Sequence, residues 1–357
     1  MITANTVLVL GAGANMPYGF PSGKELAYEI YRPSGIVPTP GLLHHPCSQI
    51  DPDYFSQHFQ IPKDYLQYFK NALATSQLSV DAFLENRADE AMLRVGKLSI
   101  AAILLNCEKH DRLFIGKPPY HHFEDVRHSD RLARQDGHWY GLLWDRLCEP
   151  DNKNNPADLF DRIPESNLSI ITFNYDRSLE YYLLTALQAN TGRSLEDCKR
   201  QLSNIKIVHI YGSLGSLLDS GELAVPFGED WFNNSHFLEC AASGINLARR
   251  YAVDQDMPTI AEACSLLEKA HHIIFIGFGF DPVNLSRLGF TPGELVKYPA
   301  RISATIQGIS MKTKLDIKGI AGDNSLATYK ISNRVFHDNN LFDSSAYDYI
   351  FNNDVLQ

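Results

Sequence analysis

The sequence has no two cysteines spaced as a CxxC pair, which argues against a structural zinc site and against a redox dithiol. Its six cysteines are scattered singly through 357 residues, as is usual in a reducing cytoplasm. It also lacks an apolar run near the ~20 residues that a membrane helix needs, and its first residues show no basic stretch or cleavage site. We therefore expect a cytoplasmic protein with no signal peptide, no membrane segment and no metal.

Basic residues are also fewer than acidic residues. Lys and Arg together number 32 against 42 Asp and Glu, which gives a formal net charge of -10. Broad binding to nucleic acid needs a positive surface, so we expect no direct nucleic-acid binding, although a local basic groove stays open. The hydrophobic content of 44% is ordinary for a globular protein. The length suits one large domain or two small ones.

An apolar segment followed by glycines organises the chain. Residues 7–10 are apolar and rich in valine and leucine, which is typical of a buried strand in a parallel sheet. Glycine lets the backbone turn tightly and approach a ligand, and amides freed at such a turn can bind phosphate. We predict a pyrophosphate-binding loop formed by Gly11, Ala12, Gly13, Ala14 and Asn15. Because the third glycine of GxGxxG is missing, a strand end without a ligand remains the alternative.

Further strands are predicted at residues 168–173, 205–211, 272–276 and 301–307, with helices between them. This alternation indicates an α/β fold, a Rossmann-like doubly wound parallel sheet built from residues 1–24 and 161–357. Residues 25–160 are predicted to be a mostly helical insertion. Its first helix has Ser22 as cap and Glu25 as capping-box partner. Residues 222–240 are expected to be irregular.

Polar residues or glycines follow the predicted strands at 11–15, 172–176, 209–213 and 277–284. Parallel strands end at one edge of a sheet, so these four segments should meet there. Taken singly, Asn174 and Asp176 are explained equally well as caps of the next helix, and His209 is better explained as a core histidine. Taken as a set, the four segments favour an active site.

The motifs GAGAN, TFNYD, HIYGS and GFGFDPVN together resemble the sirtuin (silent-information-regulator) superfamily. Thr172, Asn174 and Asp176 match its second motif position by position, and residues 79–84 resemble a segment of its bacterial, non-deacetylase branch. The zinc ribbon of sirtuin deacetylases is missing from this chain. Members without that ribbon are NAD-cleaving effectors of antiphage defence, so the resemblance implies an NAD+ glycohydrolase that yields nicotinamide and ADP-ribose.

The resemblance also suggests roles for individual residues. Asn174 would hold the ribose and place the water, and Asp176 would orient the nicotinamide carboxamide. His209 would move a proton, with Tyr211 beside it, because residues i and i+2 of a strand share a face. Tyr211 stands where the family has its catalytic histidine, so either residue could hold that position. Further contacts to NAD+ are predicted for Thr172, Gly212, Ser213, Gly277, Phe278, Gly279 and Asn284.

Unregulated NAD+ hydrolysis would kill the host, so an intact site implies control. We expect a homo-oligomer and a regulatory partner protein, for example an ATPase, an Argonaute-like protein or a nucleotide-sensing subunit. Three alternatives stay open. The chain could bind NAD or an ADP-ribose-type nucleotide without turnover, could be an NAD-dependent deacylase or ADP-ribosyltransferase, or could be a defence-complex subunit with degenerate chemistry. The sequence also leaves open whether the product is ADP-ribose or a cyclic form.

Overall fold

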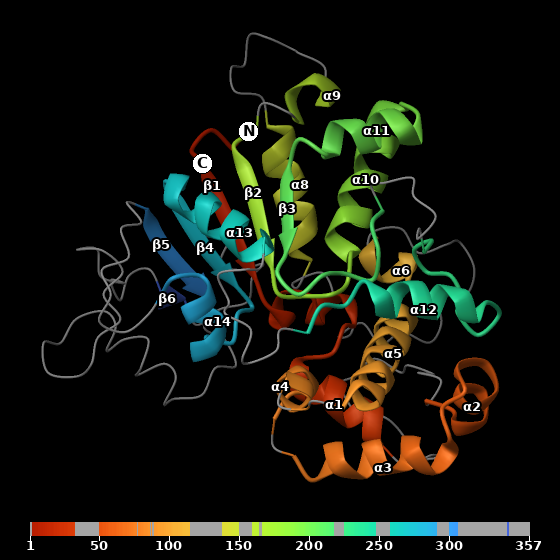
Figure 1. Cartoon of the computed structure of the whole chain (residues 1–357). Helices are drawn as coiled ribbons and strands as arrows, with labels where there is room; N and C mark the ends of the chain where they lie inside the picture. Colours follow the sequence, from red (N-terminus) through yellow and green to blue (C-terminus); the bar gives the residue numbers. More distant parts are fainter. Residues whose placement is uncertain are drawn as a thin grey trace, which may run out of the picture.

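The computed structural model describes residues 2–32, 50–76, 78–85, 87, 89–114, 138–149, 159–163, 166–217, 225–247, 258–290, 300–305 and 341–342. It confirms the predicted doubly wound α/β fold. The parallel strands lie in the order β3-β2-β1-β4-β5-β6 (Figure 1). They are β1 (Thr6–Leu10), β2 (Leu168–Thr172), β3 (Lys206–His209), β4 (His272–Ile276), β5 (Arg301–Thr305) and β6 (Leu341–Phe342).

Strand β1 occupies the middle of the sheet, and all five of its residues are buried, as its apolar sequence predicts. Leu10 lies in register with Thr172 on one side and with Ile276 on the other, and Thr172 lies beside His209. The carboxyl ends of β1 to β4 are therefore aligned. The chain builds the sheet to one side through β2 and β3 and then to the other from β4, so the switch point lies between β1 and β4.

Helices cover both faces of the sheet. In Figure 1, α13 (Pro258–Lys269) lies in front of the strands and α8 (Trp139–Cys148) lies behind them. Helix α8 packs against α10 (Ser178–Thr191), which contacts α11 (Leu195–Leu202). The two short helices of this part are α9 (Leu159–Arg162) and α14 (Pro282–Arg287).

Several helices lie beyond the carboxyl ends of the strands (Figure 1). They are α1 (Gly23–Tyr31), α2 (Pro52–Phe59), α3 (Lys63–Ala74), α4 (Val80–Glu85), α5 (Glu90–Cys107), α6 (His110–Leu113) and α12 (Ser235–Ser243). Helix α1 begins as predicted, because the Ser22 side chain accepts from the Glu25 amide and the Glu25 carboxylate accepts from the Ser22 amide. The domain boundary predicted at residue 160 stays a prediction; α8, which precedes it, packs beside the sheet.

Two predictions about local structure are wrong. Residues 222–240 were expected to be irregular, yet α12 begins at Ser235, where the Asn234 side chain accepts from the His236 amide at 3.2 Å. The strand expected over 205–211 ends at His209, because the chain turns there and the Gly212 amide donates to the His209 carbonyl. Within the described residues, no helix has both the length and the apolar character that a membrane crossing requires.

Candidate functional site

The loops after β1 and β4 are in direct backbone contact at the switch point. The Gly11 amide donates to the Ile276 carbonyl at 3.1 Å, and the Gly13 amide donates to the Gly277 carbonyl at 3.0 Å. A Cβ atom on Gly277 would lie 2.0 Å from the Ala14 nitrogen, and its φ of 57° is in the left-handed region. These glycines therefore allow the two loops to pack against each other.

This packing also uses most of the loop amides. Besides the amides of Gly11 and Gly13, the Ala14 amide donates to Gly11 and the Asn15 amide donates to Ala12. Within the described residues, the Ala12 amide is the only one of the five without an acceptor. In this conformation a pyrophosphate would find one loop amide available, and binding by the other four stays a prediction.

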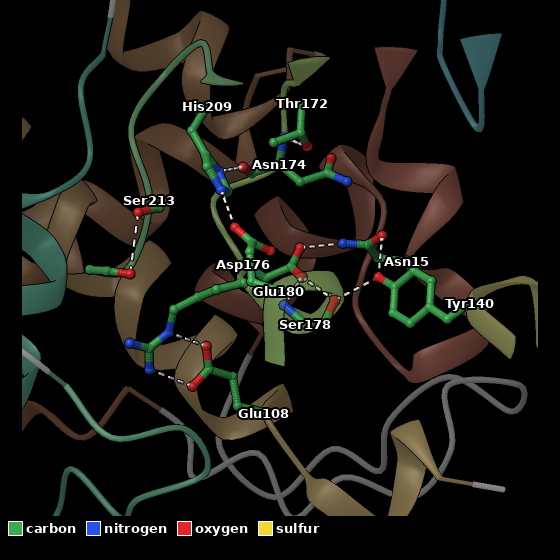
Figure 2. Close-up of polar contacts among 12 residues, drawn as sticks. Asn15, Glu108, Tyr140, Thr172, Asn174, Asp176, Ser178, Glu180, His209 and Ser213 are labelled. Carbon is green, nitrogen blue, oxygen red and sulfur yellow. Dashed lines mark hydrogen bonds and ion pairs between the residues drawn. The ribbon is translucent and has the colours of Figure 1, made fainter. Parts of the chain in front are cut away.

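Asp176 lies at the centre of a buried polar network (Figure 2). One carboxylate oxygen accepts from the Asn15 side-chain amide at 2.5 Å, and the other accepts from the amide and the hydroxyl of Ser178. The Tyr140 hydroxyl donates to Asn15 and contacts the Ser178 hydroxyl at 2.7 Å. Burial raises the pKa of Asp176, although the hydrogen bonds from Ser178 and Asn15 act to lower it. Both oxygens are thus used to hold the start of α10 and the β1 loop.

Asn174 has a different arrangement. Its side-chain nitrogen donates to the Gly11 carbonyl at 3.0 Å, and its backbone amide donates to the Thr172 hydroxyl at 3.1 Å. Its side-chain oxygen accepts no hydrogen bond from any described residue. Asn174 therefore does not cap α10. It joins the end of β2 to the end of β1 and keeps one acceptor for a ligand.

A pocket of about 60 Å³ lies at these strand ends. Its lining includes Ala12, Asn15, Asn174 and Asp176 from the strand ends, with Asp81 from α4. That volume corresponds to roughly four to six water molecules, which is the size of one sugar ring and too small for a dinucleotide. A larger pocket of about 360 Å³ lies between α5 and α12 and contains none of the strand-end residues. We consider the smaller pocket the candidate site because the polar groups converge there.

His209 is held between two acceptors. Its Nδ1 lies 2.9 Å from the Asn174 carbonyl oxygen, and its Nε2 lies 2.6 Å from a carboxylate oxygen of Glu180 in the first turn of α10 (Figure 2). With Glu180 ionised, both nitrogens carry protons. Burial lowers the pKa of His209, but Glu180 and the Asn174 carbonyl outweigh it and the pKa is raised. In this arrangement the ring has no nitrogen free to accept a proton, so its role as a base stays a prediction.

Tyr211 contacts residues different from those that hold His209. Its hydroxyl donates to the side-chain oxygen of Asn284 and accepts from Arg287, and its ring packs edge-on against Phe173. Burial raises the pKa of Tyr211, while Arg287 acts to lower it. β3 ends before Tyr211, so the i, i+2 rule does not apply, and the expectation that His209 and Tyr211 line one pocket stays a prediction.

The remaining predicted contacts fall into two groups. Phe278 is buried and packs against Phe173 and Phe275, and the Ser213 amide donates to the Gly244 carbonyl. Gly279 is exposed, and a Cβ atom there would meet nothing within 4 Å. Phe278 and Ser213 therefore have structural partners within the chain, whereas Gly279 leaves room for a ligand beside the backbone. Their contacts with NAD+ stay predictions.

A buried ion pair lies beside this site. Arg177 forms two hydrogen bonds with Glu108 at 3.0 and 2.9 Å, and their side chains are 1% and 0% exposed. Arg177 also donates to the Val225 carbonyl. The pair joins the end of α5 to the start of α10, next to Asp176 (Figure 2).

Three residues at the site were not predicted from the sequence: Asp81, Glu180 and Tyr140. Glu180 stands in the first turn of the helix predicted after β2, so a carboxylate close to a strand end was a usable signal, whereas Asp81 lies in a helix that no local pattern connects to the strand ends. Tyr140 gave no such signal. In the described part of the chain, no three His, Cys, Asp or Glu residues are grouped to hold a metal ion.

Neither a protein-family model nor a curated protein matches the chain. The likeness to sirtuins therefore rests on the strand-end motifs.

Proposed function

We propose that the chain binds NAD+ at the switch point of its sheet and hydrolyses the bond between nicotinamide and ribose. The observation that carries this proposal is the arrangement of Asn174. Its nitrogen is fixed by the Gly11 carbonyl at the end of β1, beside the switch point, and its oxygen is left open in the pocket at the strand ends. An oriented amide oxygen at that place suits a ribose hydroxyl and the attacking water.

Hydrolysis of the bond between nicotinamide and ribose needs little help from a proton-transfer group. When the bond between C1′ of the ribose and the pyridinium nitrogen breaks, the electron pair stays on nitrogen and nicotinamide leaves as a neutral molecule. Cleavage needs no proton donor, and the oxocarbenium-like ribose then adds water at C1′. The water loses its proton to solvent or to a nearby carboxylate. A site in which His209 is paired with Glu180 can therefore still perform the reaction.

The geometry also supports control of the activity. The pocket holds one sugar, and four of the five loop amides donate within the chain. To enclose the rest of a dinucleotide as well as one sugar, the strand-end loops or the helices beyond them would have to move. We propose that assembly or a partner protein supplies that movement, as expected for an NAD+ hydrolase effector of antiphage defence. Full turnover by the isolated chain would contradict this gating.

A second function, nucleotide binding without turnover, is favoured by one observation. Tyr211 stands where related proteins have histidine, and its hydroxyl is engaged by Asn284 and Arg287. A sensor that reports NAD or ADP-ribose to a partner would use the same pocket and would need no histidine at that position.

The test is incubation of the purified full chain with NAD+, followed by chromatography of the products. We expect a low basal release of nicotinamide and ADP-ribose by the isolated chain, reduced on the order of 100-fold in Asn174→Ala. Asn71→Ala is the matched control, because Asn71 is exposed on α3 and its side chain contacts Gln67. It should match the unmodified protein.

A binding titration with NAD+ accompanies the assay. Binding without nicotinamide release, with or without candidate partners, would favour the sensor function. If the protein neither binds NAD+ nor releases nicotinamide, both proposed functions are overturned.

A further inference from the structure

We propose that Asp81, supplied by α4, is the carboxylate of the pocket that contacts the ligand, and that it binds the hydroxyl groups of a ribose together with Asn174. This inference deepens the proposed function and rests on it. It assigns ligand contact to a residue outside the strand-end motifs.

The two carboxylates that line the pocket differ in how their oxygens are used. Asp176 accepts three hydrogen bonds, one from Asn15 and two from Ser178, which occupy both of its oxygens. Asp81 accepts from one neighbouring side chain, the Tyr175 hydroxyl, at 2.5 Å on one oxygen. The Asp81 carboxylate also accepts from its own backbone amide, and no other described residue donates to it. A carboxylate has about four acceptor sites, so Asp81 keeps about two of them for a ligand and Asp176 keeps about one.

Asp81 is also held in place from two directions. Helix α4 packs against α1 and α5, which lie over the strand ends. Tyr175 follows β2 and stands between Asn174 and Asp176 in the sequence. Its hydroxyl donates to the Asp81 carboxylate and fixes it from that side. An acceptor that is already oriented loses little freedom when a ligand arrives, which favours binding.

The open polar groups indicate the class of ligand. The Asp81 oxygen and the Asn174 side-chain oxygen are both acceptors, so they require a ligand with donors. A ribose offers two neighbouring hydroxyl groups, and the pocket of about 60 Å³ is the size of one sugar. The rest of a dinucleotide would lie outside this pocket.

The experiment compares ADP-ribose with ADP, which lacks the terminal ribose, in calorimetric titrations of the full chain. The unmodified protein should bind ADP-ribose at least about tenfold more tightly than ADP, because a charged acceptor strengthens the hydrogen bonds. Asp81→Asn keeps the shape and an acceptor for Tyr175, and should bring that ratio close to one while the affinity for ADP changes little. Asp64→Asn makes the same chemical change at an exposed position of α3 and should keep the ratio.

Tyr175→Phe provides a second variant, because it leaves the Asp81 carboxylate in place but removes the hydrogen bond that orients it, so the ratio should fall only in part and stay above that of Asp81→Asn. An Asp81→Asn ratio equal to that of the unmodified protein, an equal loss for both ligands, or no binding of ADP-ribose by the unmodified protein would each overturn the inference. If Asp81 controls ADP-ribose binding but NAD+ releases no nicotinamide, the inference stands and the hydrolase proposal fails.

Discussion

At His209, both ring nitrogens lie beside acceptor oxygens, and this sets the charge of the ring. The contact with Glu180 gives the folded state a raised pKa. A group whose folded pKa lies above its unfolded value stabilises the fold when protonated. That contribution is fully present below the unfolded pKa of about 6.5 and is lost as the pH rises through the folded value.

We therefore expect Glu180→Gln to reduce the free energy of unfolding by about 1–3 kcal/mol at pH 6. The loss should be smaller at pH 9 than at pH 6, because a rise in pH removes the proton on which the charged pair depends. Urea unfolding at both pH values measures the difference. Glu196→Gln, which removes an exposed carboxylate that pairs with Lys199, should show no such dependence. An equal loss at both pH values for Glu180→Gln would contradict a charged His209.

At the scale of helices and strands, the sequence predicts the sheet well because its strands are short apolar runs that end in glycine or polar residues. β1, β2 and β4 match the predicted segments to within a residue. The end of β3 was missed, because the turn depends on pairing of Gly212 with Ile245 from a distant segment. Helix α12 was missed because it is short and follows a stretch rich in aromatic residues and asparagine.

The candidate site could be predicted from the sequence only in part, because several of its contacts also join distant segments of the chain. Sequence order places Asn174 and Gly11 at neighbouring strand ends, and the structure joins them by a hydrogen bond. The partners of His209 and Asp176 come from helix turns whose orientation depends on tertiary packing. Asp81 lies farther still, in a helix between β1 and β2, so no local pattern connects it to the strand ends.

The contact between the β1 and β4 loops gives a prediction at this scale. Gly277→Ala should reduce the free energy of unfolding by about 3 kcal/mol or more, because the new Cβ would meet the Ala14 backbone at 2.0 Å. Gly192→Ala has a similar φ of 64° but nothing within 4 Å, so it should cost only about 1–2 kcal/mol. Thermal and urea unfolding of both variants separate backbone strain from the clash. Equal losses would show that the loops can move apart freely.

At the scale of the whole molecule, one buried ion pair connects the helices beyond the strand ends to the sheet. Glu108 ends α5 and Arg177 precedes α10, and Arg177 also holds the carbonyl of Val225. Removing one partner of a buried pair leaves an uncompensated charge, which costs more than the pair itself contributes.

Glu108→Gln should therefore reduce the free energy of unfolding by about 3–5 kcal/mol, measured by chemical unfolding. Adding Arg177→Met should restore part of this loss, because the unpaired charge is then gone. Glu262→Gln breaks an exposed pair with Lys206 and should change stability by less than about 1 kcal/mol. A Glu108→Gln variant as stable as Glu262→Gln would show that the pair does not hold the two parts together.

The central place of β1 has a consequence for how the protein is made. β1 leaves the ribosome before the other described strands, yet its neighbours begin at Leu168 and His272. At about 5–20 residues per second, its first partner follows only after roughly 10–30 s of translation. Throughout that time the apolar segment at residues 7–10 has no sheet to join. Synthesis of this protein should therefore depend on chaperones that shield the nascent chain, and a ribosome stalled before Leu168 would carry a product that cannot begin its sheet.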